Sequence, residues 1–178
     1  MAQYRLALEA GENRPMALFN MGNCLYLMKQ VGRALASYQN AVEIAPAFVR
    51  PYLNIGGIYF SLDEIGLAIS NYRRALELDP GNLAAIKIQG ESHLKLGERA
   101  EALAYFEKGR RSDPADLDCY QNAAEMGENE VAVAGMLNIG KRLFKRGDVE
   151  GAKAVFARIK GAFPGDLQVT QALSDPGS

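Results

Sequence analysis

A period of 34 residues organises most of this 178-residue sequence. Four kinds of residue keep the spacing: Tyr4, Tyr38, Tyr72 and Phe106; Gly22, Gly56 and Gly90; Ala34, Ala68 and Ala102; Pro46, Pro80 and Pro114. Internal repeats of this length are typical of stacked helical hairpins, in which each unit buries its apolar face only against its neighbours. The period therefore predicts an all-α solenoid of antiparallel helix pairs.

The first complete repeat, residues 15–48, shows how the residues of one unit would form two packed helices. Leu18, Met21 and Leu25 fall at i, i+3 and i+7, which places them on one helical face. Gly22 lies on the side that faces the second helix, where a small residue permits close approach, and Ala34 is expected to lie opposite it. We therefore expect the two helices of a repeat to pack through small residues.

The helix ends are marked by proline and by short polar side chains. Pro46 lacks an amide proton and disfavours helical geometry in the residue before it, so the second helix should end there. Asn82 and Asp116 stand where the next first helices begin, and both are good N-cap residues. Asp166 is expected to cap a short last helix over residues 167–173.

Residues 49–82 carry the most complete set of repeat positions: Tyr52, Ile55, Gly56, Tyr59, Ala68, Tyr72, Ala75 and Pro80. This pattern resembles the tetratricopeptide repeat, with a large apolar residue at position 4, small residues at 8, 20 and 27, aromatic residues at 11 and 24, and proline at 32. The resemblance covers residues 1 to about 116. It implies a right-handed superhelical solenoid in which the first helix of each pair lines a concave groove.

The register slips after Asp116 and resumes 50 residues beyond its earlier counterparts, which is 34 plus 16, at Ile139, Gly140, Leu143, Ala152, Phe156 and Pro164. The predicted segments are the second helix of a truncated repeat (1–14), repeats at 15–48, 49–82 and 83–116, an inserted helix or partial repeat (117–132), a repeat at 133–166, and a short capping helix and tail (167–178). We expect a kink at the slip. Because the sequence begins in the middle of a repeat, we also expect it to be a fragment of a longer protein.

Composition limits the function classes. A net charge of −1 gives no reason to expect nucleic acid as a partner, and no apolar run is long enough to span a membrane. Cys24 and Cys119 are too few for a disulfide framework, which favours a reducing compartment such as the cytoplasm. His93, the one histidine, occupies an aromatic position of its repeat and is interpreted as a packing residue. No metal site, cofactor or enzyme activity is predicted.

The resemblance places repeat positions 2, 5, 6, 9 and 13 on the groove. Position 6 holds Asn20, Asn54, Ile88, Asn122 and Asn138, and position 9 of the first repeat holds Asn23. An asparagine side chain can pair with either main-chain group of an extended peptide, because it both donates and accepts. The row resembles the asparagine ladder of the O-GlcNAc transferase repeats. The alternative is that asparagine at this position is a common structural feature of such repeats.

The other groove positions predict an apolar part and a charged part. Phe19 and Leu53 would contact an apolar side chain of the ligand. Charged residues that would choose among ligand charges are Arg50, Lys87, Glu91 and Lys141. Lys95 and Lys145 extend a basic half-groove that would favour an acidic segment or a C-terminal carboxylate. The alternative is that these lysines are simply solvated.

The predicted function is a non-catalytic protein-protein interaction module that binds an extended or helical peptide segment of a partner. A chaperone-type carboxylate clamp is not expected, because its places hold Phe19, Asn23, Asn54, Ala84 and Ile88 and lack the cations that such a clamp needs. Two alternatives remain open. The chain could be the substrate-docking or regulatory arm of a larger enzyme, for example a glycosyltransferase. It could also be a scaffold that forms homo-oligomers through its array ends.

Overall fold

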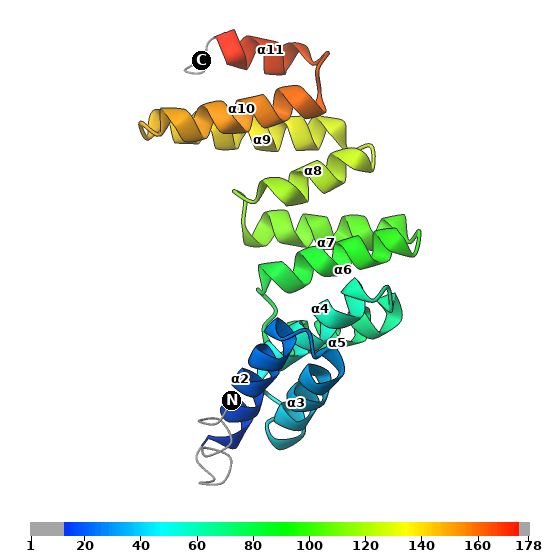
Figure 1. Cartoon of the computed structure of the whole chain (residues 1–178). Coiled ribbons are helices and arrows are strands. Elements are labelled where there is room, and N and C mark those ends of the chain that lie inside the picture. The colour runs from blue at the N-terminus through cyan, green and yellow to red at the C-terminus, as the bar shows by residue number, and fades with distance from the viewer. Residues whose placement is uncertain (1–12, 175–178) are drawn as a thin grey trace. The chain divides into compact units, whose positions relative to one another are not determined.

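The computed structural model describes residues 13–174, which form helices joined by short turns, without strands (Figure 1). The predicted second helix of a truncated repeat lies almost wholly outside these residues. The chain divides between Glu98 and Arg99 into two compact units. No helix within residues 13–174 combines the length and the apolar character needed to cross a bilayer. The all-α fold predicted by the 34-residue period is confirmed.

The first unit is a run of helices in which each packs on the next. Its helices are α2 (Arg14–Leu27), α3 (Val31–Ile44), α4 (Val49–Ser61), α5 (Ile65–Leu78) and α6 (Leu83–Lys95). The largest interhelical contacts within this unit join α2 to α3 and α4 to α5, the two helices of each predicted repeat. The helices therefore associate as pairs, and the pairs stack through α3 on α4 and α5 on α6.

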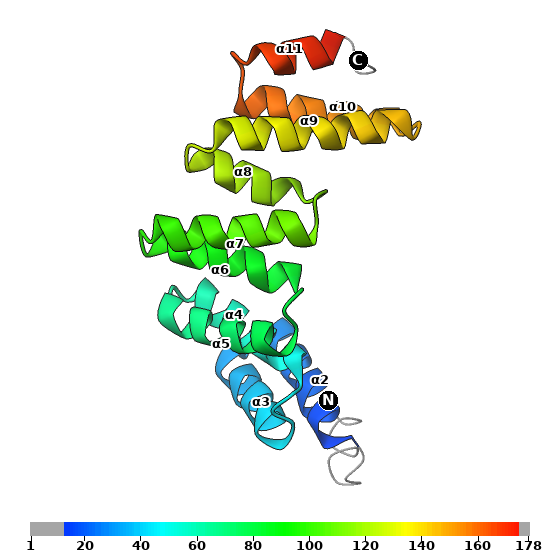
Figure 2. The same ribbon diagram turned by 180° about the vertical axis from the view of Figure 1, so that it is seen from behind.

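The second unit departs from this pairing at its central helix. Its helices are α7 (Arg99–Ser112), α8 (Leu117–Glu125), α9 (Asn129–Lys145), α10 (Val149–Ala162) and α11 (Leu167–Ser174). The helix α9 lies between α8 and α10 and packs extensively on both, as the two opposite views agree (Figures 1 and 2). Because α9 begins at Asn129, it runs without interruption through residue 133, where the sequence placed the start of a new repeat.

A glycine beneath an aromatic ring joins each helix pair of the first unit. A Cβ atom built on Gly22 would lie 2.5 Å from Cε1 of Tyr38, and one on Gly56 would lie 2.9 Å from Cε2 of Tyr72. Both rings are only 2% exposed. The close approach predicted for Gly22 is present, but a tyrosine ring stands opposite it, where the sequence suggested Ala34. The ring fills the space that a side chain at the glycine would otherwise occupy.

The second unit uses the same contact twice on one helix. Gly140 of α9 lies under the ring of Phe156 in α10, and Gly135 of α9 lies against the ring of Tyr120 in α8. An alanine Cβ at either glycine would overlap the ring atoms. The helix α9 can therefore pack closely against both neighbours.

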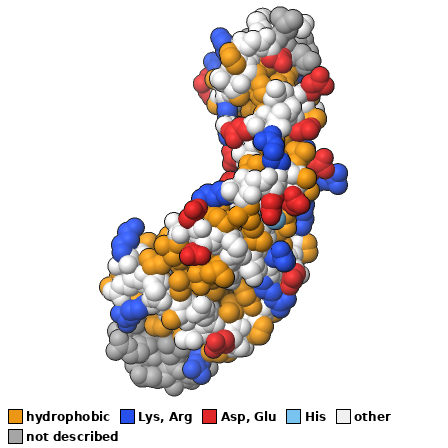
Figure 3. Space-filling model, turned by 90° about the vertical axis from the view of Figure 1, so that its right-hand side faces the viewer, with side chains coloured by type: hydrophobic (Ala, Val, Ile, Leu, Met, Phe, Trp, Pro, Cys, Tyr) orange, Lys and Arg blue, Asp and Glu red, His pale blue; other side chains and the backbone are white. Residues whose placement is uncertain are grey.

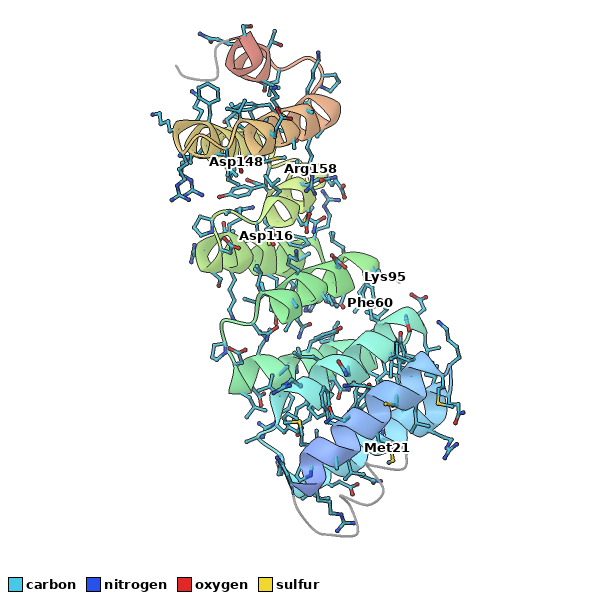
Figure 4. The ribbon with its side chains drawn as sticks, turned by 60° about the vertical axis from the view of Figure 1, so that its left-hand side comes forward. Met21, Phe60, Lys95, Asp116, Asp148 and Arg158 are labelled. Carbon is cyan, nitrogen blue, oxygen red and sulfur yellow. The ribbon has the colours of Figure 1, made fainter. Side chains whose placement is uncertain are left out.

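The helix ends follow the sequence expectations. Asn82, Asp116 and Asp166 each accept a hydrogen bond from the amide of the third residue beyond, at 3.1, 3.0 and 3.2 Å. These bonds satisfy amides that lack partners in the first helical turn. Asp148 caps α10 in the same way at 2.9 Å, and Figure 4 shows Asp116 and Asp148 at the starts of their helices.

Candidate functional site

A pocket of about 390 Å³ lies in the first unit, between the first helices α2 and α4. Its lining residues are Asn23, Tyr26, Leu27, Tyr38, Leu53, Asn54, Gly57 and Ile58. None of these side chains carries a charge at neutral pH. Tyr26 is 43% exposed and Leu27 is 79% exposed, so the rim is open to a ligand and apolar. Figure 3 shows hydrophobic side chains gathered on one face in the part of the molecule next to the grey N-terminal residues.

Two asparagine side chains and one tyrosine hydroxyl form the polar part of the pocket. The Tyr38 hydroxyl donates to Oδ1 of Asn23 at 2.8 Å, and Nδ2 of Asn54 donates to the same oxygen at 2.9 Å. Both lone pairs of the Asn23 oxygen are thus used. Nδ2 of Asn23 and Oδ1 of Asn54 make no hydrogen bond within residues 13–174. The pocket therefore presents one free amide donor and one free amide acceptor.

The protonation of Tyr38 holds this arrangement in place. Burial raises the pKa of Tyr38 above its ordinary value, and the nearby side-chain amide of Asn54 lowers the pKa by a smaller amount. The hydroxyl consequently keeps its proton at neutral pH and remains a donor. Since a donor must face the oxygen of Asn23, the amide of Asn23 is oriented with its NH₂ group away from Tyr38.

Phe19 is a support for the site and offers little surface to a ligand. Its side chain is 7% exposed, and its ring lies 5.8 Å from the Tyr38 ring and 5.3 Å from the Phe48 ring, centroid to centroid. The guanidinium of Arg50 stands 5.7 Å from the centroids of both Phe19 and Phe48. This cation-π contact fixes the exposed Arg50 side chain on α4.

The predicted groove residues fall into separate groups. Asn23, Leu53 and Asn54 are brought together in the pocket. Asn20 is half-buried on α2, one turn before Asn23, and Lys87 and Glu91 are half-buried one turn apart on α6. Asn122 on α8 and Lys141 on α9 belong to the second unit and are also half-buried.

Two other residues singled out from the sequence have close partners in the first unit. Lys95 Nζ lies 2.7 Å from Oδ1 of Asp63 and 4.8 Å from the centroid of the Phe60 ring (Figure 4). His93 is largely buried, and its Nδ1 lies 2.5 Å from Oε2 of Glu98. Lys95 is therefore already paired on the protein. Within residues 13–174, no group of three or more His, Cys, Asp or Glu residues is placed to hold a metal ion.

Several residues of the pocket were not singled out from the sequence. Leu27 and Gly57 occupy repeat positions 13 and 9, which the resemblance placed on the groove, so the register contained this signal. Gly57 occupies the repeat position that Asn23 holds in the preceding repeat. Because glycine has no side chain, Gly57 leaves space in the pocket. Tyr38 could not have been found in this way, because its ring position faces the core and only its hydroxyl reaches the pocket.

Two segments that share this architecture match known sequence families. Residues 15–48 and residues 49–82 each match a family model described as a tetratricopeptide repeat. The chain contains two consecutive tetratricopeptide repeats. Its pocket thus lies between the first helices of two consecutive tetratricopeptide repeats.

Solved structures agree on the tetratricopeptide-repeat fold. YrrB, described as a tetratricopeptide-repeat protein with an unusual peptide-binding site, matches 96% of this chain over 97% of its own, with a TM-score of 0.64 and 19% identity. MamA matches 96% of this chain over 86% of its own, with a TM-score of 0.62 and 21% identity. The first tetratricopeptide domain of Spaghetti (RPAP3), bound to the HSP90 peptide SRMEEVD, matches 64% of this chain over 90% of its own, with a TM-score of 0.60 and 18% identity. No curated protein sequence matches the chain.

Proposed function

We propose that this protein is a non-catalytic interaction module whose first unit binds an extended segment of a partner protein in the pocket between α2 and α4. Two structural neighbours support a role of this class, since one is described by its peptide-binding site and another holds a bound peptide. Asn23 and Asn54 would bind the main chain of the segment. Leu53, Leu27 and Tyr26 would surround one of its apolar side chains.

The observation that carries this proposal is the shared oxygen of Asn23. Because that oxygen accepts from both Tyr38 and Asn54, the remaining donor on Asn23 and the remaining acceptor on Asn54 are left in one pocket. An extended peptide offers a carbonyl and an amide that match such a pair. Main-chain recognition of this kind supplies affinity without specifying a sequence, so the apolar walls would set the preference.

The pocket favours an uncharged side chain over a carboxylate. No charged group lines it, and burying a carboxylate without a cationic partner is costly. Ala84 and Ile88 on α6 stand where a carboxylate clamp would need cations. Contacts by Asn20, Arg50, Lys87 and Glu91 outside the pocket, and by Asn122 and Lys141 in the second unit, stay predictions.

The same binding pocket would serve a docking arm attached to a larger enzyme. The proposal assigns no reaction to these residues. The one histidine is engaged with Glu98, and Cys24 and Cys119 are not joined in a disulfide.

The test is to select peptides on the protein from a random library and to measure their affinity by calorimetry. Asn54→Ala removes an acceptor while Tyr38 keeps its bond to Asn23, and about fivefold weaker binding is expected for one lost hydrogen bond. Gly57→Leu fills the pocket and should weaken binding by about tenfold or more. Asn40→Ala, at an exposed position on α3, is the matched control and should bind as the wild type does.

Circular dichroism and melting curves establish that the variants are folded. Because Gly57→Leu could strain α4, Leu53→Ala is a second pocket variant. It removes a pocket wall without adding volume. Selected peptides that bind all of these variants as tightly as the wild type would refute the pocket as the binding site. Selection of acidic peptides whose binding is weakened by Gly57→Leu would contradict the preference of the pocket for an uncharged side chain.

A further inference from the structure

The C-terminal end of α9 and its C-cap residue, Arg146, carry a group of four cations on the second unit. Lys141, Arg142, Lys145 and Arg146 lie within six residues at the C-terminal end of this helix, and we call them the α9 cationic surface. Lys141 and Lys145 are one turn apart, and so are Arg142 and Arg146, which sets the four side chains in two neighbouring rows. Arg142, Lys145 and Arg146 are exposed, and Lys141 is half-buried.

Three of the other seven basic residues of this unit pair with carboxylates, unlike these four. Arg111 pairs with Glu107 at 3.3 Å, Lys153 pairs with Glu150 at 2.9 Å, and Arg158 pairs with Asp118 at 2.6 Å. No member of the α9 cationic surface forms an ion pair with any residue in the range 13–174. The unit therefore neutralises several of its cations internally and leaves this group without a counter-charge.

The acidic groups that follow α9 are already engaged. Asp148 uses Oδ1 to accept from the amide of Gly151 as the cap of α10, and Glu150 pairs with Lys153. Neither is committed to the α9 cationic surface. The turn from α9 into α10 (Figure 1) therefore offers the surface little compensation from its own chain.

Helix stability does not account for four cations at this place. A cation in the last turn interacts favourably with the helix dipole, but this effect falls off within one turn and is screened by salt. Like charges one turn apart disfavour the helix, and the two rows place two such pairs side by side. By comparison, α7 has two basic residues in its last turn, and α2 and α4 have none.

We propose that the α9 cationic surface binds a short acidic segment of a partner protein. Carboxylates would form charge-assisted hydrogen bonds with the two arginines and two lysines. This site lies in the other unit from the α2–α4 pocket and takes a ligand of opposite character, so it does not depend on the function proposed above. Lys141, which the sequence predicted to contact a ligand, would bind together with Arg142, Lys145 and Arg146.

Charge along the second unit favours an acidic peptide over a nucleic acid. Residues 113–130 carry six Asp and Glu residues and no Lys or Arg, and they form α8 and the start of α9. A long polyanion following the basic end of α9 along this unit would meet that acidic stretch and be repelled. A short segment with about four carboxylates can instead match the four cations locally.

The test measures the binding of fluorescein-labelled hexaglutamate to the full chain by fluorescence anisotropy, at about 50 and about 200 mM salt. Replacing all four cations by glutamine (K141Q, R142Q, K145Q, R146Q) is expected to weaken binding by about tenfold or more at the lower salt concentration. A control with the same net charge replaces four exposed cations of the first unit (R14Q, K29Q, R33Q, R73Q) and should change the affinity less than about twofold. Binding of the wild type should weaken at the higher salt concentration.

Hexaglutamine, a single-stranded RNA oligonucleotide and phosphatidylserine vesicles are the comparison ligands. Weak or absent binding of all three supports the proposal. It would be overturned by equal losses in the two four-residue variants, since net charge alone would then explain the binding. It would also be overturned if hexaglutamate failed to bind, or if RNA or vesicles bound through the same four residues more tightly than hexaglutamate. Circular dichroism confirms that the variants are folded, and an R142K, R146K variant that keeps the charges should retain most of the affinity.

Discussion

The two units use the same helix-packing contact in different arrangements. In the first unit, Gly22 lies under Tyr38 and Gly56 under Tyr72, so α2 and α4 each contribute one glycine and α3 and α5 each contribute one ring. In the second unit, α9 contributes two glycines, Gly135 toward α8 and Gly140 toward α10. Regular helix pairs can thus be followed by a helix, α9, that packs closely against the helix before it and the helix after it.

The comparison explains how the array tolerates a break in its period. An inserted helix must bury its apolar side on something, or the stack would end there. A second glycine one and a half turns from the first opens a second face of α9 to a ring from the preceding helix. The longer α9, with 17 residues against 13 or 14 in the helices of the first unit, supplies the room for both contacts.

The rings over the glycines differ in one chemical respect. Those of the first unit, Tyr38 and Tyr72, carry an ionisable hydroxyl, and Phe156 of α10 does not. Burial, with a smaller contribution from nearby Glu91, raises the pKa of Tyr72 to about 12 from an ordinary value of 10.0. The unfolded chain would therefore lose this proton first as pH rises. The contribution to stability is complete below pH 10.0 and is lost as the pH approaches 12, by about 2 to 3 kcal/mol.

We therefore expect alkaline pH to destabilise the first unit more than the second. Amide hydrogen exchange between pH 9 and 11 (about one unit on either side of the ordinary tyrosine pKa), corrected for its intrinsic pH dependence, would measure each unit separately. The control is Tyr72→Phe, which should reduce the loss in α4 and α5. Equal loss in both units, or no effect of Tyr72→Phe, would contradict the role assigned to this ring.

Gly135→Ala tests the second pairing of α9. The added Cβ would overlap the Tyr120 ring, and overpacking of this kind costs about 1 to 3 kcal/mol, which exceeds the gain of up to about 1 kcal/mol in helix propensity. The measurement is urea unfolding followed by circular dichroism. The matched control is Gly161→Ala on α10, where nothing lies within 4 Å of the added atom and stability should rise or stay unchanged. A neutral Gly135→Ala would show that the α8–α9 contact is loose.

The turns between paired helices give a smaller test. Lys29 and Asp63 adopt positive φ angles of 60° and 63° in the first unit, at repeat positions where the later turns have Gly97 and Gly147 with φ of 78° and 84°. This conformation disfavours side chains other than glycine. Lys29→Gly should raise the free energy of unfolding by up to about 1 kcal/mol, and Gly147→Ala should lower it by about 1 kcal/mol. Thermal melting of both variants checks the signs, and a destabilised Lys29→Gly would show that the Lys29 side chain has a compensating contact.

Much of the fold follows from local rules that the sequence displays. The 34-residue period predicts the helix pairs, and Asn82, Asp116 and Asp166 mark helix starts because their side chains can replace missing intrahelical partners. The partner of Gly22 could not be predicted in the same way. Periodicity indicates that two helices approach each other, while the choice between Ala34 and Tyr38 depends on the rotation of both helices about their axes.

The candidate site was predicted in part, for a related reason. Asn23, Leu53 and Asn54 follow from the register of the first helices, and the structure brings them together. The bond from Tyr38 to Asn23 depends on how far a core ring reaches, which residue spacing does not contain. For Phe19 the repeat register predicted a residue exposed to the ligand, and the structure shows a covered one. Phe48 and Arg50 pack on its ring, which the register alone does not indicate.

The most direct test of the central claim is to follow the side-chain amide resonances of Asn23 and Asn54 by NMR while a selected peptide is added. Our account predicts that both NH₂ groups shift in a saturable manner with the affinity found by calorimetry. The amides of Asn40 on α3 and Asn138 on α9, which are exposed and lie outside the pocket, should stay unchanged. Saturable binding that leaves Asn23 and Asn54 unshifted would contradict the claim that this pocket holds the partner.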